Sequence, residues 1–141
     1  MPWSEAYFLK EVKPQIDHDR IRYIERLPYR DIVDLMGKAR GFLFPLQWDE
    51  PFGLVVIEAM AAGTPVIAYG RGSMPELIKN GETGYLVRSE DEMVAMACQT
   101  EKFDRARCRA WVAERFSINR MVTGYERLYG ATVREQSALK K

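Results

Sequence analysis

Residues 44–68 read FPLQWDEPFGLVVIEAMAAGTPVIA and carry the strongest fold signals of the chain. An apolar run at 41–45 has the length of a buried strand and ends in a proline. After a polar loop, residues 54–62 show a helix pattern that is apolar nearly all round, and Gly63 stands where a helix is capped. A second buried strand is predicted at 65–68. Two apolar strands joined by one crossover helix predict a right-handed βαβ unit, so we expect these strands to be parallel, adjacent and central in a sheet.

The rest of the chain continues this alternation. We predict further strands at 21–24 and 85–87, a turn at 80–84, a helix capped by Ser89 with acidic residues in its first turn, and helices at 30–39, 75–78, 104–116 and 117–129. Strands alternating with helices predict an α/β fold, a Rossmann-like parallel sheet with flanking helices. Such sheets bind ligands at the carboxyl ends of their strands, where the loop 46–53 begins.

Composition bounds the function. The 141 residues suit one domain, and 47% hydrophobic with 29% charged residues is ordinary for a globular protein. A net charge of +1 gives no case for nucleic-acid binding, and no apolar run has the length of a membrane span. We expect Cys98 and Cys108 to be reduced thiols of a cytoplasmic protein. Residues 101–141 are basic, with 10 Lys/Arg against 5 Asp/Glu, which indicates either a solvated helix face or a peripheral contact with an anionic membrane or partner.

The polar residues of the segment 44–68 suggest a binding site. Gly53 carries no side chain where a helix begins, so nearby backbone N–H groups are open to an anion such as phosphate. Glu58 is the only charged residue between Glu50 and Arg71, and an ionised carboxylate on an apolar helix is costly unless it is paired or reaches a polar cavity. Glu50, these amides and Glu58 therefore fit one crevice that binds sugar hydroxyls. The same residues also fit a surface glutamate and a plain turn.

The segment from Glu50 to Glu58, with seven residues between the glutamates, resembles the E-x7-E signature of retaining glycosyltransferases of family 4, which have the two-domain GT-B fold. The continuation at 59–68 resembles the family's EAMA-x-GTPVIA segment, and 72–76 and 80–84 resemble its G-x-x-PE and DG-x-TG segments. The resemblance covers about residues 20–130. It implies the nucleotide-sugar-binding C-terminal half of a GT-B fold.

The resemblance also implies roles for individual residues. Glu58 would accept hydrogen bonds from the ribose of the nucleotide, and Glu50 would hold hydroxyls of the donor sugar near the reacting centre. The backbone amides of Phe52, Gly53 and Leu54 would contact the sugar and diphosphate. Thr64 would lie near the nucleotide.

The chain departs from the family at its beginning. No Arg and Lys stand where the family clamps the diphosphate, and residues 1–20 resemble a later part of the domain. We therefore expect a partial donor-binding domain at 1–130, truncated at its N-terminal side, and a frayed tail at 131–141. His18 is expected to be structural or exposed.

Three functions remain open at this point. The first is part of an enzyme that transfers a hexose-type sugar from a nucleoside-diphosphate donor to an unknown acceptor, without metal or cofactor. The others are a donor-binding subunit that needs a separate acceptor-domain chain, and an inactive remnant. The predicted helix 117–129 carries an apolar face, which in the intact family crosses to the acceptor domain and here favours a homodimer.

Overall fold

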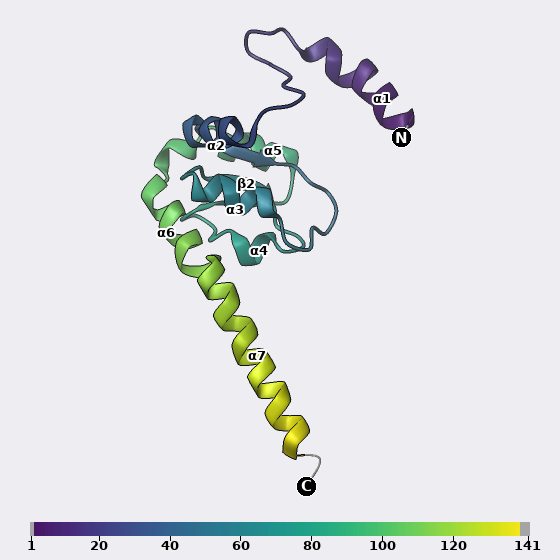
Figure 1. The fold of residues 1–141 in the computed structure, drawn as a ribbon. Helices are drawn as coiled ribbons and strands as arrows, with labels where there is room; N and C mark the ends of the chain where they lie inside the picture. The colour runs from purple at the N-terminus through teal and green to yellow at the C-terminus, as the bar shows by residue number, and fades with distance from the viewer. Residues whose placement is uncertain (1, 139–141) are drawn as a thin grey trace. The chain divides into compact units, whose positions relative to one another are not determined.

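Residues 2–138 are described by the structure, a computed structural model, with side chains from residue 5 to residue 136. The chain divides into two units, Met1–Ile32 and Val33–Lys141 (Figure 1). The α-helix α2, Tyr29–Lys38, contains the division and matches the helix predicted at 30–39. Of its apolar side chains only Met36 is buried, whereas Val33 and Leu35 are exposed.

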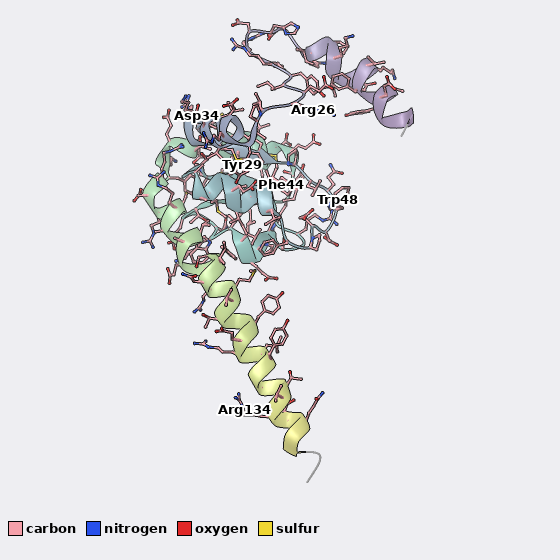
Figure 2. The ribbon with its side chains drawn as sticks, viewed as in Figure 1. Arg26, Tyr29, Asp34, Phe44, Trp48 and Arg134 are labelled. Carbon is pink, nitrogen blue, oxygen red and sulfur yellow. The ribbon has the colours of Figure 1, made fainter. Side chains whose placement is uncertain are left out.

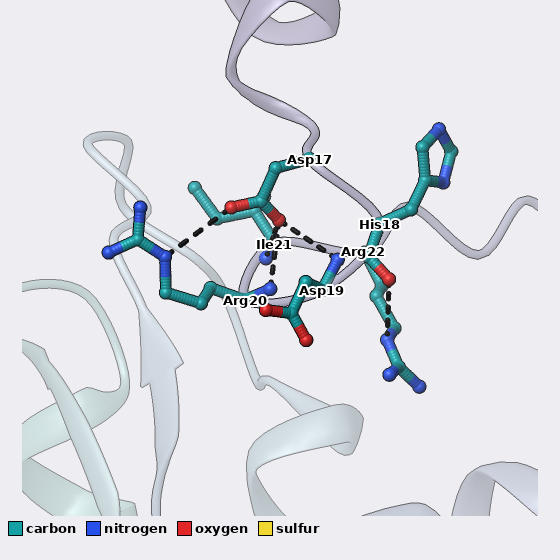
Figure 3. Close-up of polar contacts among 6 residues, drawn as sticks. All are labelled: Asp17, His18, Asp19, Arg20, Ile21 and Arg22. Carbon is teal, nitrogen blue, oxygen red and sulfur yellow. Dashed lines mark hydrogen bonds and ion pairs between the residues drawn. The ribbon is translucent and has the colours of Figure 1, made fainter.

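The first unit consists of short helical segments and a polar turn. The α-helix α1, Pro2–Tyr7, continues as the π-helix η1, Phe8–Val12, and the 3-10 helix η2, Lys13–Gln15. In the turn that follows, the Asp17 Oδ1 atom accepts the backbone N–H groups of Asp19, Arg20 and Ile21 at 3.0, 2.8 and 2.8 Å (Figure 3). These hydrogen bonds lower the pKa of the Asp17 carboxyl, and the bond from Ile21 has the largest effect. His18, exposed as expected, has a positive φ of 60° in this turn.

The strand predicted at 21–24 is wrong for the described structure. Residues 22–24 have no regular secondary structure, and the side chains of Ile21, Tyr23 and Ile24 are 49, 55 and 49% exposed. The backbone N–H of Ile21 is used by the Asp17 turn, and none of 21–24 pairs with another strand within residues 2–138. An apolar run becomes a strand only where a neighbouring strand takes its hydrogen bonds.

The second unit is built on a parallel sheet in the order β1-β2-β3, comprising β1 (Phe42–Phe44), β2 (Val66–Tyr69) and β3 (Gly84–Val87). Phe42 aligns with Val66, and Val66 with Gly84. The prediction of parallel, adjacent strands near 41–45 and 65–68 is confirmed. The expectation that both are central is wrong, because β1 lies at an edge of the described sheet.

Helices cover both faces of this sheet (Figure 1). On one face, α5 (Glu90–Ala97) packs Met93 against Ile67 and Val87. On the other face, α3 (Leu54–Ala61) contacts β1 and β2 and buries Val56 and Met60 completely. Since alternate residues of a strand face opposite ways, every residue of β2 from Val66 to Ala68 is fully buried. The predicted Rossmann-like α/β fold is thus confirmed.

The remaining helices surround this core. The short helix α4, Met74–Leu77, follows β2, and the 3-10 helix η3, Thr100–Lys102, follows α5. The helix α6, Arg105–Arg115, packs on α3 and buries Cys108 and Val112. Ser89 caps α5 as predicted, since its Oγ accepts the N–H of Glu92 at 3.2 Å.

The last helix, α7, spans Ile118–Ala138 and is longer than predicted. Residues 131–138 are helical, where a frayed tail is expected from sequence, while 139–141 lie outside the described residues. Val133 repeats the apolar spacing of Tyr129 one turn later, which continues the amphipathic pattern past Gly130.

Candidate functional site

The start of α3 offers unused hydrogen-bond donors. Gly53 is its N-cap with φ 89°, a left-handed conformation, and a Cβ there would lie 2.8 Å from Met74 Cε and 3.2 Å from Leu77 Cδ1. Only glycine fits this turn, since it combines positive φ with close packing. Within residues 2–138, the backbone N–H groups of Leu54 and Val55 donate to no protein acceptor. A helix start of this kind attracts anions.

Glu50 lies beside this helix start. Its Cγ is 3.7 Å from the position that a Cβ on Gly53 would take. The Trp48 indole Nε1–H donates to Glu50 Oε2 at 3.3 Å, and Trp48 itself stands on the exposed loop after β1 (Figure 2). The structure therefore brings Glu50, Phe52, Gly53 and Leu54 together at the carboxyl edge of the sheet, where the exposed side chains of Phe52 and Leu54 flank the glycine.

Glu58 lies further along the same helix. It is half-buried and follows Leu54 by four positions, a rise of about 6 Å along the helix axis. That its carboxylate faces the same crevice as Gly53 stays a prediction.

Thr64 is separated from this group. It follows the end of α3, where Gly63 and Thr64 donate their N–H groups to Met60 O and Ala59 O at 2.9 Å each, the capping expected at Gly63. It therefore lies before the amino end of β2, whereas the loop carrying Glu50 leaves the carboxyl end of β1.

The hydroxyl of Thr64 is already engaged. Thr64 is 0% exposed, its Oγ1 donates to Met36 O, and it accepts from Arg105 Nη2 at 3.0 Å. Arg105 also donates to Gly37 O at 2.6 Å and Ala39 O at 2.8 Å. Thr64 thus joins the ends of α2 and α3 to α6, and this position indicates a structural role.

The loop after β2 holds the loop that carries Glu50, and sequence reasoning missed this. Ser73 donates its N–H to Glu50 O at 2.9 Å and its hydroxyl to Phe52 O at 2.7 Å. Arg71 donates through Nε to Asp49 Oδ1 at 3.0 Å and through Nη1 to Gln47 O. The resemblance of 72–76 to a family segment pointed to this loop without indicating what it contacts.

Two hollows lie beside these loops. An open pocket of about 500 Å³ at the carboxyl ends of β2 and β3 is lined by polar and charged side chains, among them Gln47, Tyr69, Arg71, Arg88 and Glu90. A second of about 520 Å³ is mostly apolar and lies between α3 and α7, with Phe52, Leu54, Phe116, Met121 and Tyr125 among its walls. In the part of the chain that the structure describes, no three His, Cys, Asp or Glu side chains group as metal ligands. No helix among these residues is both long and apolar enough to span a bilayer.

Comparisons with known proteins agree with this architecture. The family described as "Glycosyl transferases group 1" matches residues 6–103. N-acetyl-alpha-D-glucosaminyl L-malate synthase of Bacillus anthracis is 36% identical over 135 residues, 90% of this chain and 35% of that protein. Spore coat protein SA of Bacillus subtilis is 39% identical over 69 residues, 49% of this chain and 18% of that protein. The structure of sucrose-phosphate synthase from Thermosynechococcus elongatus is similar with a TM-score of 0.70 and 29% identity, covering 92% of this chain and 35% of that one. The chain thus spans about a third or less of these relatives.

Proposed function

We propose that this chain, which belongs to the group 1 glycosyl transferases, binds the nucleoside-diphosphate sugar donor of a retaining, family 4 enzyme. The observation that carries the proposal is the Glu50 side chain beside a helix start where the N–H groups of Leu54 and Val55 have no protein acceptor within residues 2–138. A nucleoside-diphosphate sugar presents the two complements together, since its diphosphate is an anion and its sugar hydroxyls donate hydrogen bonds.

In this proposal each group has one role. The amides of Phe52, Gly53 and Leu54 bind the diphosphate and sugar end of the donor, Glu50 holds sugar hydroxyls, and Glu58 holds the ribose hydroxyls. Backbone N–H groups directed at the leaving diphosphate stabilise the charge that develops on it as the glycosidic bond breaks. This supplies the electrostatic part of catalysis from the protein's own dipoles, without a metal ion. Glu50 acts by orientation and not as a covalent nucleophile.

In this proposal, the binding site for the acceptor lies in another part of the protein or in another chain. The apolar face of α7 is suited to binding a protein partner, because its large side chains are 44–63% exposed: Met121, Val122, Tyr125, Leu128 and Tyr129. We propose that this face meets the acceptor domain in the complete enzyme, and that the chain by itself forms a homodimer through it and is catalytically silent. Light scattering at micromolar concentration tests the dimer, and a monomer there contradicts it. A cytoplasmic location belongs to the same proposal and is supported by the free thiols.

Titration calorimetry of the chain with UDP, GDP and their sugars tests donor binding. Replacing Glu58 with alanine should weaken binding by roughly 1.5–3 kcal/mol, the scale of a hydrogen bond to a charged group. Glu114→Ala, on α6, is the matched control and should bind as wild type, because Glu114 lies outside the proposed site. Equal affinity of the Glu58 and Glu114 variants would remove Glu58 from the site, and absence of binding by the wild-type chain would refute the proposed function.

A further inference from the structure

The loop that carries Glu50 has little structure of its own. Nine residues, 45–53, separate the end of β1 from the start of α3, and none of them belongs to a helix or a strand. Trp48 is 66% exposed and Phe52 47% exposed, so burial of its large side chains does not fix the loop. Its conformation depends on a few polar contacts, because an unrestrained loop samples many conformations at little cost.

Those contacts come from Arg71 and Ser73 of the next loop. Ser73 holds the carbonyl groups of Glu50 and Phe52, and Arg71 holds the carbonyl of Gln47 together with the Asp49 carboxylate. Between them, Gly72 has φ 54°, and a Cβ there would lie 2.7 Å from both Glu50 N and Glu50 O. The two backbones are therefore in direct contact at Glu50.

From this geometry we infer that Arg71 is a positioning residue, which clamps the loop 46–50 so that the Glu50 side chain stays beside the helix start. The inference rests on the proposed function for its consequence in donor binding. Ser73 fixes the backbone at and after Glu50, while Arg71 fixes the stretch before it. Trp48 lies between the two residues that Arg71 holds, and its indole reaches the carboxylate. Because Trp48 stands between these two residues and donates to Glu50 Oε2, the bonds of Arg71 also restrain the Glu50 side chain.

The exposure of the Arg71–Asp49 pair indicates that Arg71 affects the conformation of the loop and not the stability of the whole fold. The Arg71 and Asp49 side chains are 47 and 72% exposed, and ion pairs as open as this add little to overall stability. The guanidinium is suited to holding geometry, because its planar fork donates to a carboxylate and a carbonyl at once. Loss of Arg71 should therefore loosen the loop while leaving the fold intact.

The experiment compares Arg71→Gln with Arg40→Gln. Arg40 pairs with Glu101 in another exposed ion pair, before β1, so its variant removes the same charge away from the site. Two readouts are recorded on the full chain. The first is the indole N–H resonance of Trp48 in ¹⁵N NMR spectra without ligand, assigned by Trp48→Phe. The second is calorimetric affinity for UDP and GDP and for UDP-glucose, UDP-N-acetylglucosamine and GDP-mannose.

For Arg71→Gln we expect the Trp48 resonance to shift or broaden, and affinity for the sugar conjugate that binds wild type to fall about tenfold, the equivalent of one hydrogen bond. Affinity for the matching nucleoside diphosphate should stay within about twofold, because Glu50 holds the sugar only. Asp49→Asn should act in the same direction and add little to Arg71→Gln, as partners in one contact do. Arg40→Gln should leave both readouts unchanged.

The outcomes separate the inference from the proposed function. A Trp48 resonance at its wild-type position in Arg71→Gln, or equal weakening of the diphosphate and its sugar conjugate, overturns the positioning role. If wild type binds none of the five nucleotides, the proposed function fails, and the Trp48 resonance alone decides whether Arg71 clamps the loop.

Discussion

Replacing Thr64 with valine tests whether this residue is structural. The change keeps the shape of the side chain and removes the hydroxyl, which donates to Met36 O and accepts from Arg105. Because Thr64 is 0% exposed, water cannot take the place of the lost hydroxyl as hydrogen-bond partner of Met36 O and Arg105. The bond to the carbonyl is worth about 1 kcal/mol, and the bond from the guanidinium about 1.5 kcal/mol at the low end for a charged group.

The low end applies because Arg105 is half-buried and keeps the carbonyls of Gly37 and Ala39 as acceptors. We therefore expect Thr64→Val to lower the free energy of unfolding by about 2.5 kcal/mol. With a urea m-value of about 1–3 kcal/mol/M, the midpoint should fall by roughly 1–2.5 M. Urea titration followed by circular dichroism at 222 nm measures this.

Thr64→Ser is the matched control, since it keeps the hydroxyl and loses one buried methyl group, at a cost of about 1 kcal/mol. Thr64→Val should therefore be the less stable of the two. If the valine variant is as stable as the serine variant, the hydroxyl does not hold the ends of α2 and α3. Donor affinity offers the second check: a folded Thr64→Val chain that loses nucleotide binding would restore the ligand role implied by the family resemblance.

Two further predictions concern ionisable groups. Under native conditions a maleimide should label Cys98 and spare Cys108, giving one adduct per chain by mass spectrometry and two in urea, because burial raises the pKa of the Cys108 thiol and keeps it neutral and covered; two native adducts would contradict this packing. Hydrogen bonds from Lys79 and then Arg107 lower the pKa of Glu82, so the stability it contributes is present above its unfolded pKa and lost as pH falls through the folded value. The melting temperature of Glu82→Gln should consequently lie slightly below wild type at pH 7 and meet it at acid pH, whereas a constant offset would show that ionisation of Glu82 is not involved.

The strands and most helices could be predicted because their signals are local. The runs at 41–45, 65–68 and 85–87 are apolar, short and bounded by turn residues, and each coincides with a strand of the sheet to within one residue at either end. The apolar run at 21–24 gives the same signal but no strand, since periodicity does not reveal whether a pairing partner exists. The grouping of Glu50 with Gly53 could likewise be predicted, because one short segment contains both.

The contacts that shape the site join residues far apart in the chain. Arg71 reaches Gln47 and Asp49, and Arg105 reaches back to Gly37 and Thr64. Nothing in a single sequence distinguishes these arginines from solvated ones, since their acceptors include backbone carbonyls, which every residue has. The same lack of signal placed Thr64 with the ligand, because family resemblance gives the identity of a residue without its hydrogen-bond partners here.

The anchoring of Arg105 bears on where an autonomous folding unit ends. The segment that matches the group 1 glycosyl transferase family, residues 6–103, ends two positions before α6 begins. Yet α6 supplies Arg105 to three acceptors, Trp111 Nε1–H to Leu77 O at 2.7 Å, and the cover over α3. A chain shortened to residues 6–103 would uncover α3 and leave these oxygens without their donors. Exchange of this module between relatives should therefore include α6, since the unit that folds cooperatively extends past the segment that defines the family.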